Sequence, residues 1–275
     1  MLNTEKFRTY VQLGAAVLQN SYFFKELKFC PTPALNCYAC PLAVTACPMG
    51  SLQNLILKGY LPVALVGFFV SVGAVVGRAS CGWVCPFGYL QELLHKLGKN
   101  KVSVSNGHSW TRYVVLLMLA VIAPFITKSP VFCKICPAGT LEAGIPLVLG
   151  DPSIRAMVGL LFWAKLAILA LLVWAAIMIK RPFCRFICPL GAIYSPFNRV
   201  SALKMVVDGK CVRCGACKDV CPMDMEIYKE PDSGVCIRCM KCAKCSAVGA
   251  NFMGRPLIKA GRDGKLGRAA YEDKR

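Results

Sequence analysis

Apolar runs separated by short polar segments fill the first two thirds of the chain. Four of these runs, at residues 10–24, 55–76, 110–126 and 156–179, predict four membrane-spanning helices. A helix needs about 20 apolar residues to cross a hydrocarbon core of about 30 Å. The last three runs are near that length, whereas the first is shorter and contains Gln12 and Asn20. We therefore expect the first helix to be tilted or to enter the membrane only in part.

The polar segments between these runs predict an orientation. The basic residues that follow the second and fourth runs are Arg78, Lys96, Lys99, Lys101, Lys180, Arg181, Arg185 and Arg199. Lys and Arg accumulate on the cytoplasmic side of membrane proteins. We expect a multi-pass protein of the cytoplasmic (inner) membrane with both termini in the cytoplasm. Residues 1–10 are polar and no small-residue cleavage site follows them, so no cleaved signal peptide is expected.

A repeat of cysteine motifs divides the apolar part into two halves. Cys37-Tyr-Ala-Cys40-Pro41 precedes the second run, and Cys81-Gly-Trp-Val-Cys85-Pro86-Phe-Gly follows it. Cys133-Lys-Ile-Cys136-Pro137 and Cys184-Arg-Phe-Ile-Cys188-Pro189-Leu-Gly flank the fourth run in the same way. Residues 1–205 are thus predicted to form a mainly α, four-transmembrane-helix bundle of two repeated hairpins, related by an axis along the membrane normal.

Residues 206–252 have a different character, rich in cysteine and charge. The string Cys211-x2-Cys214-x2-Cys217-x3-Cys221-Pro222 is the ligand run of a bacterial [4Fe–4S] ferredoxin. A second run, Cys236, Cys239, Cys242 and Cys245, ends in a shorter spacing and has Ser246 in place of proline. We predict a small α+β ferredoxin-like domain with two clusters, followed by a basic tail at 253–275.

In two-cluster ferredoxins the fourth cysteine of each run binds the other cluster. Cys245 is therefore expected to join Cys211, Cys214 and Cys217, and Cys221 to join Cys236, Cys239 and Cys242. A zinc site is the alternative, but zinc prefers four ligands in two spaced pairs.

Composition narrows the class further. The chain has 275 residues, is 56% hydrophobic and 17% charged, and carries a formal net charge of +19. Such an excess of basic residues suits a membrane surface, and no nucleic-acid recognition motif accompanies it, so a nucleic-acid partner is not expected. Eighteen cysteines in CxxC and CxxxC groups indicate cluster ligation rather than a disulfide framework.

The predicted topology assigns the remaining cysteines to two faces of the membrane. Cys81, Cys85, Cys184 and Cys188 lie on the cytoplasmic face, and four thiolates are what a [4Fe–4S] cluster takes. Buried structural thiols are the alternative. The other face carries six, namely Cys30, Cys37, Cys40, Cys47, Cys133 and Cys136. We expect Cys133 and Cys136 to join two of Cys37, Cys40 and Cys47 at a further cluster, with Cys30 spare and disulfides as the alternative.

These motifs resemble those of the NapH/NosR-type membrane polyferredoxins over nearly the whole chain. The resemblance is closest to a branch with the strings LNCYACP, ACPMGSLQ, CGWVCPFG and CPAGTLEAGIP. It implies electron transfer at the membrane, often from quinol toward a reductase on the outer face. Cys81, Cys85, Cys184 and Cys188 match the CxxxCP positions of the family.

Three functions remain open at this point. The first is an electron conduit from the ferredoxin module through one or two membrane-domain clusters to a redox partner. The second is a quinol/quinone oxidoreductase subunit, with Lys165 in the fourth run or His95 on a surface helix handling protons. The third is a membrane anchor that connects a soluble redox enzyme, or a metal-ion reductase.

Each of these functions is that of an electron-transfer subunit in a multi-subunit oxidoreductase complex, and none requires a catalytic side chain. Basic residues of the module could bind an acidic partner or anionic lipid; they are Lys210, Arg213, Lys218, Arg238, Lys241 and Lys244.

Overall fold

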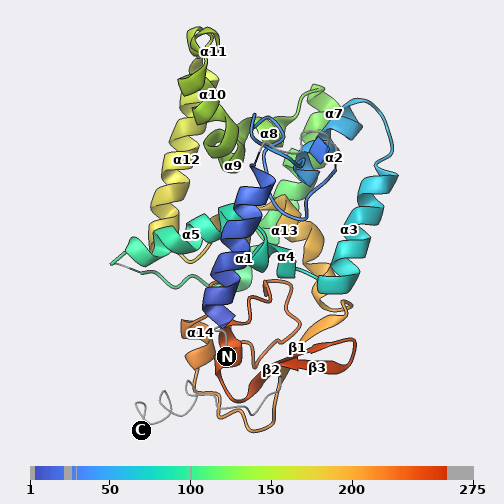
Figure 1. Cartoon of the computed structure of the whole chain (residues 1–275), viewed down its shortest axis with the longest axis vertical. Helices are drawn as coiled ribbons and strands as arrows, with labels where there is room; N and C mark the ends of the chain where they lie inside the picture. Colours follow the sequence, from blue (N-terminus) through green and yellow to red (C-terminus); the bar gives the residue numbers. More distant parts are fainter. Residues whose placement is uncertain (1–3, 22–26, 29, 100, 259–275) are drawn as a thin grey trace.

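The computed structural model describes residues 4–21, 27–28, 30–99 and 101–258. The protein is mainly helical, and a small three-stranded sheet lies at one end (Figure 1). The end of the first predicted span, at residues 22–24, and the basic tail from residue 259 onward lie outside this description.

Most of the helices follow one another with short connections, but residues 20–47 lie between α1 and α2. The first half contains α1 (Thr4–Gln19), α2 (Pro48–Leu57), α3 (Val63–Val76), α4 (Ala79–Trp83) and α5 (Pro86–Leu97). A continuous helix, Asn106–Thr127, comprises η2 (Asn106–Trp110), α6 (Thr111–Val115), the π-helical η3 (Leu116–Ile122) and α7 (Ala123–Thr127). The second half contains α8 (Val131–Ile135), α9 (Pro137–Gly139), η4 (Thr140–Gly144), α10 (Ile145–Gly150), α11 (Pro152–Ala156), α12 (Leu160–Met178), η5 (Phe183–Ile187), α13 (Pro189–Tyr194) and η6 (Pro196–Asn198).

Two helices are long and apolar enough to span a membrane: Asn106–Thr127, with 22 residues, and α12, with 19. Both expose large apolar side chains, among them Leu117, Phe125, Leu160 and Trp174. Exposed apolar surface of this extent on a helix suits lipid rather than water. The third and fourth predicted spans therefore correspond to helices of membrane length.

The first two predicted spans are not continuous helices of that length. The run at 55–76 is broken between α2 and α3, where Gly59 has a φ of 71° and Pro62 precedes α3. Proline cannot donate the backbone hydrogen bond that would continue the helix. α3 keeps only 14 residues. α1 has 16 residues and buries Arg8 and Gln12 against the protein.

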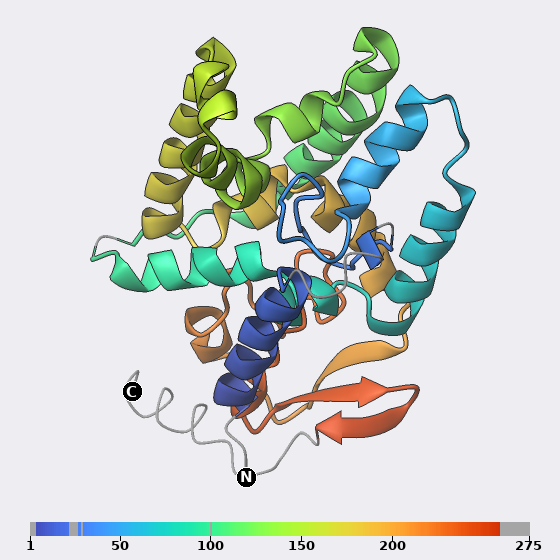
Figure 2. The ribbon, with the colours of Figure 1, turned by 45° about the horizontal axis from the view of Figure 1, so that its top comes forward.

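The segment between α1 and α2 folds into the interior. Ala34, Leu35 and Asn36 are 0%, 2% and 1% exposed, and Figure 2 shows this loop at the centre of the surrounding helices. The Asn36 side chain holds the loop, because its Nδ2 donates to the carbonyls of Gln19 and Thr45 at 3.2 Å each. The central part of this loop, which carries four of the predicted outer-face cysteines, is therefore part of the core.

The C-terminal module extends from β1 (Leu203–Val207) through α14 (Ala216–Asp219) and η7 (Lys241–Lys244) to β2 (Val248–Phe252) and β3 (Arg255–Ile258). The strands are antiparallel in the order β1-β2-β3, with Leu203 opposite Phe252 and Val207 opposite Val248. Both cysteine runs lie between β1 and β2. We call this part, 203–258, the ferredoxin module.

The ferredoxin module is packed directly on the helical part. One contiguous core includes Phe69, Cys85 and Tyr194 of the helices and Met223 and Ile237 of the module. Gly82 permits the approach, because a Cβ at this position would lie 2.4 Å from the Ile237 carbonyl oxygen. Trp83 Nε1 donates to the Arg238 carbonyl at 2.9 Å. α5 lies across this end of the helices (Figure 1).

Candidate iron–sulfur sites

Four cysteines begin helices in the same way. Cys47, Cys85, Cys136 and Cys188 are the N-cap residues of α2, α5, α9 and α13, each with extended backbone and a proline at the first helical position. Proline suits that position because its missing N–H would be unpaired anyway. In each case a glycine three residues on directs its backbone N–H at the cysteine sulfur; these are Gly50, Gly88, Gly139 and Gly191. The shared motif is Cys-Pro-x-Gly.

Two of these caps and two further cysteines form a group beside the ferredoxin module. Cys81, Cys85, Cys184 and Cys188 are buried, and each lies near enough to the other three for their charges to interact. Gln91 Nε2 donates to Cys184 Sγ at 3.2 Å, and Gly191 N donates to Cys188 Sγ at 3.4 Å. The structure thus brings together the four thiols predicted for the cytoplasmic face; we call them the inner thiol group.

The inner thiol group is formed by two segments of matching sequence, and each segment donates a hydrogen bond to the other. Residues 78–88 and 181–191 both read Arg-x2-Cys-x3-Cys-Pro-x-Gly. Arg78 Nη2 donates to the Cys184 carbonyl at 2.5 Å, and Arg181 Nη1 donates to the Cys81 carbonyl at 3.0 Å. Each arginine also lies against the glycine of the other segment, Gly191 and Gly88. The sequence repeat therefore corresponds to a reciprocal arrangement in space.

A second group of cysteines packs against the same core as the inner thiol group. Cys133 lies near Cys37 and Cys47, and Cys136 lies near Cys47 and Cys133. Cys37 Sγ is 3.3 Å from the position of a Cβ on Gly139, in the cap of Cys136. We call Cys37, Cys47, Cys133 and Cys136 the outer thiol group. Of the cysteines that the sequence left open, the structure thus brings Cys37 and Cys47 to Cys133 and Cys136.

The other two cysteines of this region have different surroundings. Cys40 is buried with Ala43 and Ala143, against which Cys37 and Leu147 also pack, and its Sγ lies 3.9 Å from the Asn20 amide oxygen. Cys30 is exposed.

A buried carboxyl group adjoins the outer thiol group. Glu142 Oε2 accepts the Cys37 N–H at 2.6 Å. Burial raises the pKa of Glu142 to about 7, although this hydrogen bond acts in the opposite direction. The sequence analysis did not identify Glu142 as a site residue. The signal for it was its place in the string CPAGTLE, close after Cys136.

In the ferredoxin module, the structure gathers one of the two predicted sets. Cys221, Cys236, Cys239 and Cys242 are mutual neighbours, with every pair near enough for charges to interact. They line a small cavity together with Met205, Met223, Met225 and Met240. Cys221 comes from the first run and the other three from the second, as in the exchanged pattern of two-cluster ferredoxins. In the other set, Cys217 lies near Cys211.

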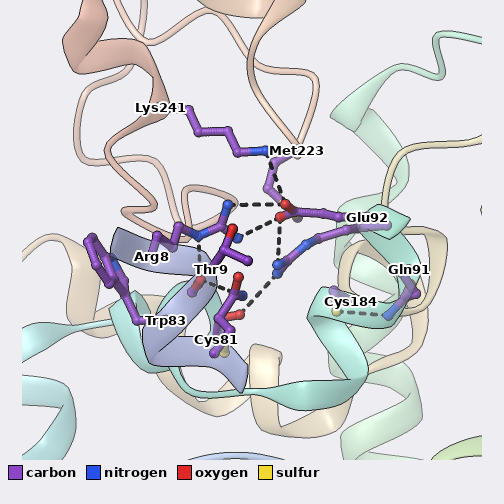
Figure 3. A network of polar contacts seen from close by, with 12 residues as sticks. Arg8, Thr9, Cys81, Trp83, Gln91, Glu92, Cys184, Met223 and Lys241 are labelled. Atoms are coloured by element: carbon purple, nitrogen blue, oxygen red, sulfur yellow. Dashed lines mark hydrogen bonds and ion pairs between the residues drawn. The ribbon is translucent and has the colours of Figure 1, made fainter. Parts of the chain in front are cut away.

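A buried charge cluster joins α1, α5, the turn after α12 and the ferredoxin module (Figure 3). Glu92 on α5 accepts hydrogen bonds from Arg8 at 2.6 and 3.0 Å and from Lys241 at 3.1 Å, and it forms an ion pair with Arg181 at 2.6 Å. Burial alone would raise the pKa of Glu92, but Arg181, Arg8 and Lys241 outweigh it and hold that pKa well below its ordinary range. Glu92 is therefore ionised and links the module to the inner thiol group.

The inner thiol group fits a [4Fe–4S] cluster by its number of thiols and by the charge around it. Its four neighbouring cysteines are the number of ligands that such a cluster takes. Some nitrogen atoms of the buried cations here also lack hydrogen-bond partners within the described ranges, namely Arg78 Nε and Arg112 Nε and Nη1. A buried charge needs an opposite charge, and a cluster with four thiolates supplies one.

The two predicted proton carriers lie in different places. Lys165 on α12 is near Cys133 of the outer thiol group. His95 on α5 lines a cleft of about 500 Å³ between the helices and the ferredoxin module. Burial and the charges of Lys101 and Lys180 lower the pKa of His95, so it is neutral at neutral pH. The structure does not bring these two residues to one site.

Comparison with known proteins gives the same chemistry. A family model described as a 4Fe-4S binding domain matches residues 58–105, 111–146 and 160–206. The uncharacterized protein MJ0750 of Methanocaldococcus jannaschii is 31% identical over 70% of this chain and 79% of its own length. The ferredoxin-type protein NapH of Escherichia coli is 29% identical over 64% of this chain and 59% of its own. This chain belongs to the NapH-type family of ferredoxin-type 4Fe-4S proteins. It is thus an iron–sulfur electron-transport protein, and the predicted family is confirmed.

Other family members show the breadth of the group. The methylamine utilization ferredoxin-type protein MauN of Methylorubrum extorquens is 29% identical over 63% of this chain. The chain spans 59% of the length of MauN and of NapH. No solved structure gives a significant match.

Proposed function

We propose that this protein conducts electrons between a cytoplasmic ferredoxin module and the outer side of the membrane, through clusters at the inner and outer thiol groups. The four predicted segments would form the membrane part, with α12 and Asn106–Thr127 crossing it and α1 and α3 completing the bundle. The ferredoxin module would hold two clusters, with Cys211, Cys214, Cys217 and Cys245 at one and Cys221, Cys236, Cys239 and Cys242 at the other.

The proximity of the two thiol groups supports this proposal most strongly. The backbone N–H of Leu35 is directed at Cys85 of the inner thiol group, and that of the next residue, Asn36, at Cys47 of the outer one. Successive backbone nitrogens are at most about 4 Å apart. The two sulfurs are then separated by on the order of 10 Å, a hydrogen bond at each end included. That is far less than a hydrocarbon core of about 30 Å.

The buried loop explains how a small bundle can bring the groups so close. Irregular backbone at membrane depth is tolerated only when protein covers it, and Ala34, Leu35 and Asn36 are buried. A [4Fe–4S] cluster supplies one-electron transfer when bound. The chain supplies the thiols, their spacing and the exclusion of water.

Electron transfer across a sealed vesicle tests the proposal. The full chain is reconstituted with a membrane-impermeant one-electron oxidant trapped inside and an impermeant reductant outside. We expect the trapped oxidant to be reduced, and Cys47→Ser to stop this, because the outer thiol group then lacks a ligand. Equal rates in vesicles with and without the protein would contradict the proposal.

A soluble redox partner with an acidic surface suits the cleft beside His95. The cleft is lined by Lys96, Lys101, Lys180, Arg181, Lys218 and Lys241, and Cys221 lies at its edge. Three acidic residues also line it, but Glu92 and Asp224 are already paired with cations. Complementary charge mainly raises the rate of association. Anionic lipid headgroups are the other ligand of such a surface.

Charge reversal in this cleft provides a measurement. We expect Lys101→Glu to slow reduction of the protein by an acidic ferredoxin about tenfold at low salt. The difference should shrink as salt is added, because exposed charges are screened. Lys58→Glu, at an exposed position after α2, serves as the control. An equal effect of both variants would exclude the cleft as the binding surface.

Quinol oxidation is a second candidate, supported by an apolar cavity of about 380 Å³. Val72, Ala79, Val84, Leu203 and Ile258 are among its lining residues, so it lies between α3, α4 and the sheet. Lys165 and His95 do not line it. We expect Val84→Trp to fill the cavity and abolish any quinol-dependent reduction of the clusters. Quinol-dependent reduction that survives this change would place the quinone elsewhere.

A further inference from the structure

Arg78 is a fully buried cation, and no described carboxylate forms an ion pair with it. Its side chain is 0% exposed, and its hydrogen bonds all go to backbone carbonyls. Nη2 donates to Cys184 at 2.5 Å, and Nη1 donates to Gly234 and Val235 of the ferredoxin module at 3.0 and 3.2 Å. None of the ion pairs among the described residues includes Arg78.

Arg78 and Arg181 each lie near cysteines of two groups, the inner thiol group and the ferredoxin module. Arg78 is close enough to Cys184 and to Cys236 of the module for their charges to interact. Arg181 is close in the same sense to Cys85, Cys184 and Cys239. The two guanidinium groups therefore lie close both to the inner thiol group and to Cys236 and Cys239 of the ferredoxin module.

Around Arg78 and Arg181, the positive charge of the described side chains exceeds the negative charge of the described carboxylates. Arg181 shares Glu92 with Arg8 and Lys241, and Lys241 also lies 3.9 Å from Glu5, so two carboxylates face three cations. Arg78 adds a fourth cation, and Arg112, which also lies near Arg78, is 2% exposed. An isolated buried cation is strongly unfavourable. Anionic cluster ligands would balance this excess.

We propose that Arg78 and Arg181 are positioning residues that provide the internal counter-charge of a cluster at the inner thiol group and raise its reduction potential. This inference rests on the proposed function. An electron that arrives from the module adds one negative charge at the inner site and removes one from the module. Buried cations stabilise the added charge, because net charge and burial set the potential of a cluster. The inner site thereby retains the electron before it moves on.

The test is a redox titration of the full chain, followed by electron paramagnetic resonance. The inner signal is identified as the one lost in Cys188→Ser. We expect Arg78→Gln to shift the reduction equilibrium of this signal about tenfold toward the oxidised form, or about 59 mV for one electron. Arg78→Lys keeps the charge, so its reduction equilibrium should stay close to that of the unchanged protein. Glu92→Gln removes the negative charge and should shift the equilibrium in the opposite direction.

Structural damage alone would not shift the reduction equilibrium in opposite directions in Arg78→Gln and Glu92→Gln. Lys58→Gln removes the same positive charge at an exposed position and should leave the inner signal unchanged. Shifts in the same direction for Arg78→Gln and Glu92→Gln, or shifts no larger than that of Lys58→Gln, would overturn the inference. If Cys188→Ser removed no signal, the proposed cluster at the inner thiol group would itself be wrong.

Discussion

A chain in which Cys188 is replaced by serine loses the cluster of the inner thiol group and no longer passes electrons beyond the ferredoxin module. Cys188 is 4% exposed, and its three neighbours Cys81, Cys85 and Cys184 leave no spare thiol in the group. We expect a loss of about four iron atoms per chain. Iron analysis and electron paramagnetic resonance measure this loss, and the signals of the ferredoxin module show that the variant is folded.

Cys30→Ser is the control for this experiment, because Cys30 is exposed and belongs to none of the thiol groups described. Its iron content should equal that of the unchanged protein. A Cys188→Ser protein with full iron content and unchanged spectra would show that the inner thiols are structural.

Replacing Cys47 removes a cluster, whereas replacing its neighbour Cys40 does not. Cys47 receives the N–H groups of Asn36, Met49 and Gly50 and lies near Cys37, Cys133 and Cys136. Cys40 instead packs against Ala43 and Ala143. We expect Cys47→Ser to lose about four iron atoms and Cys40→Ser to lose none.

Both variants keep the same loop and differ only in the thiol removed, so each is the matched control of the other. Iron content and the number of spins per chain distinguish them. Loss of iron in Cys40→Ser together with retention in Cys47→Ser would contradict the ligand set of the outer thiol group.

The sequence itself distinguishes Cys47 from Cys40 as a member of the outer thiol group. Cys47-Pro-Met-Gly50 shares its glycine with the caps at Cys85, Cys136 and Cys188, whereas Cys40-Pro-Leu-Ala43 does not. The glycine is needed because a Cβ there would meet Tyr38, Arg181, Cys37 or Arg78. A proline after cysteine predicted each turn. A glycine at the third position after the cysteine is what allows the turn to pack closely against another segment.

The break in the second predicted span could also have been predicted from the sequence. Gly59 and Pro62 interrupt the run at 55–76, and both disfavour a continuing helix. The apolar residues on either side concealed this signal, since hydropathy averages over the whole window.

Other features depend on long-range contacts and could not be predicted from local pattern. Arg78 and Arg181 were interpreted as charges of a cytoplasmic loop, yet both are fully buried. Glu92 is on an amphipathic helix, and its partners Arg8, Arg181 and Lys241 come from three distant segments. A buried charge is stable only once its partners are assembled, so burial here is a property of the fold.

The number of clusters per chain tests the central claim most directly. Purified protein assembled under anaerobic conditions is analysed for iron, acid-labile sulfide and Mössbauer spectra. Four [4Fe–4S] clusters, or about 16 iron atoms per chain, are predicted from two sites in the ferredoxin module and one at each of the inner and outer thiol groups. Two clusters, or about eight iron atoms, would contradict a path of clusters through the membrane part.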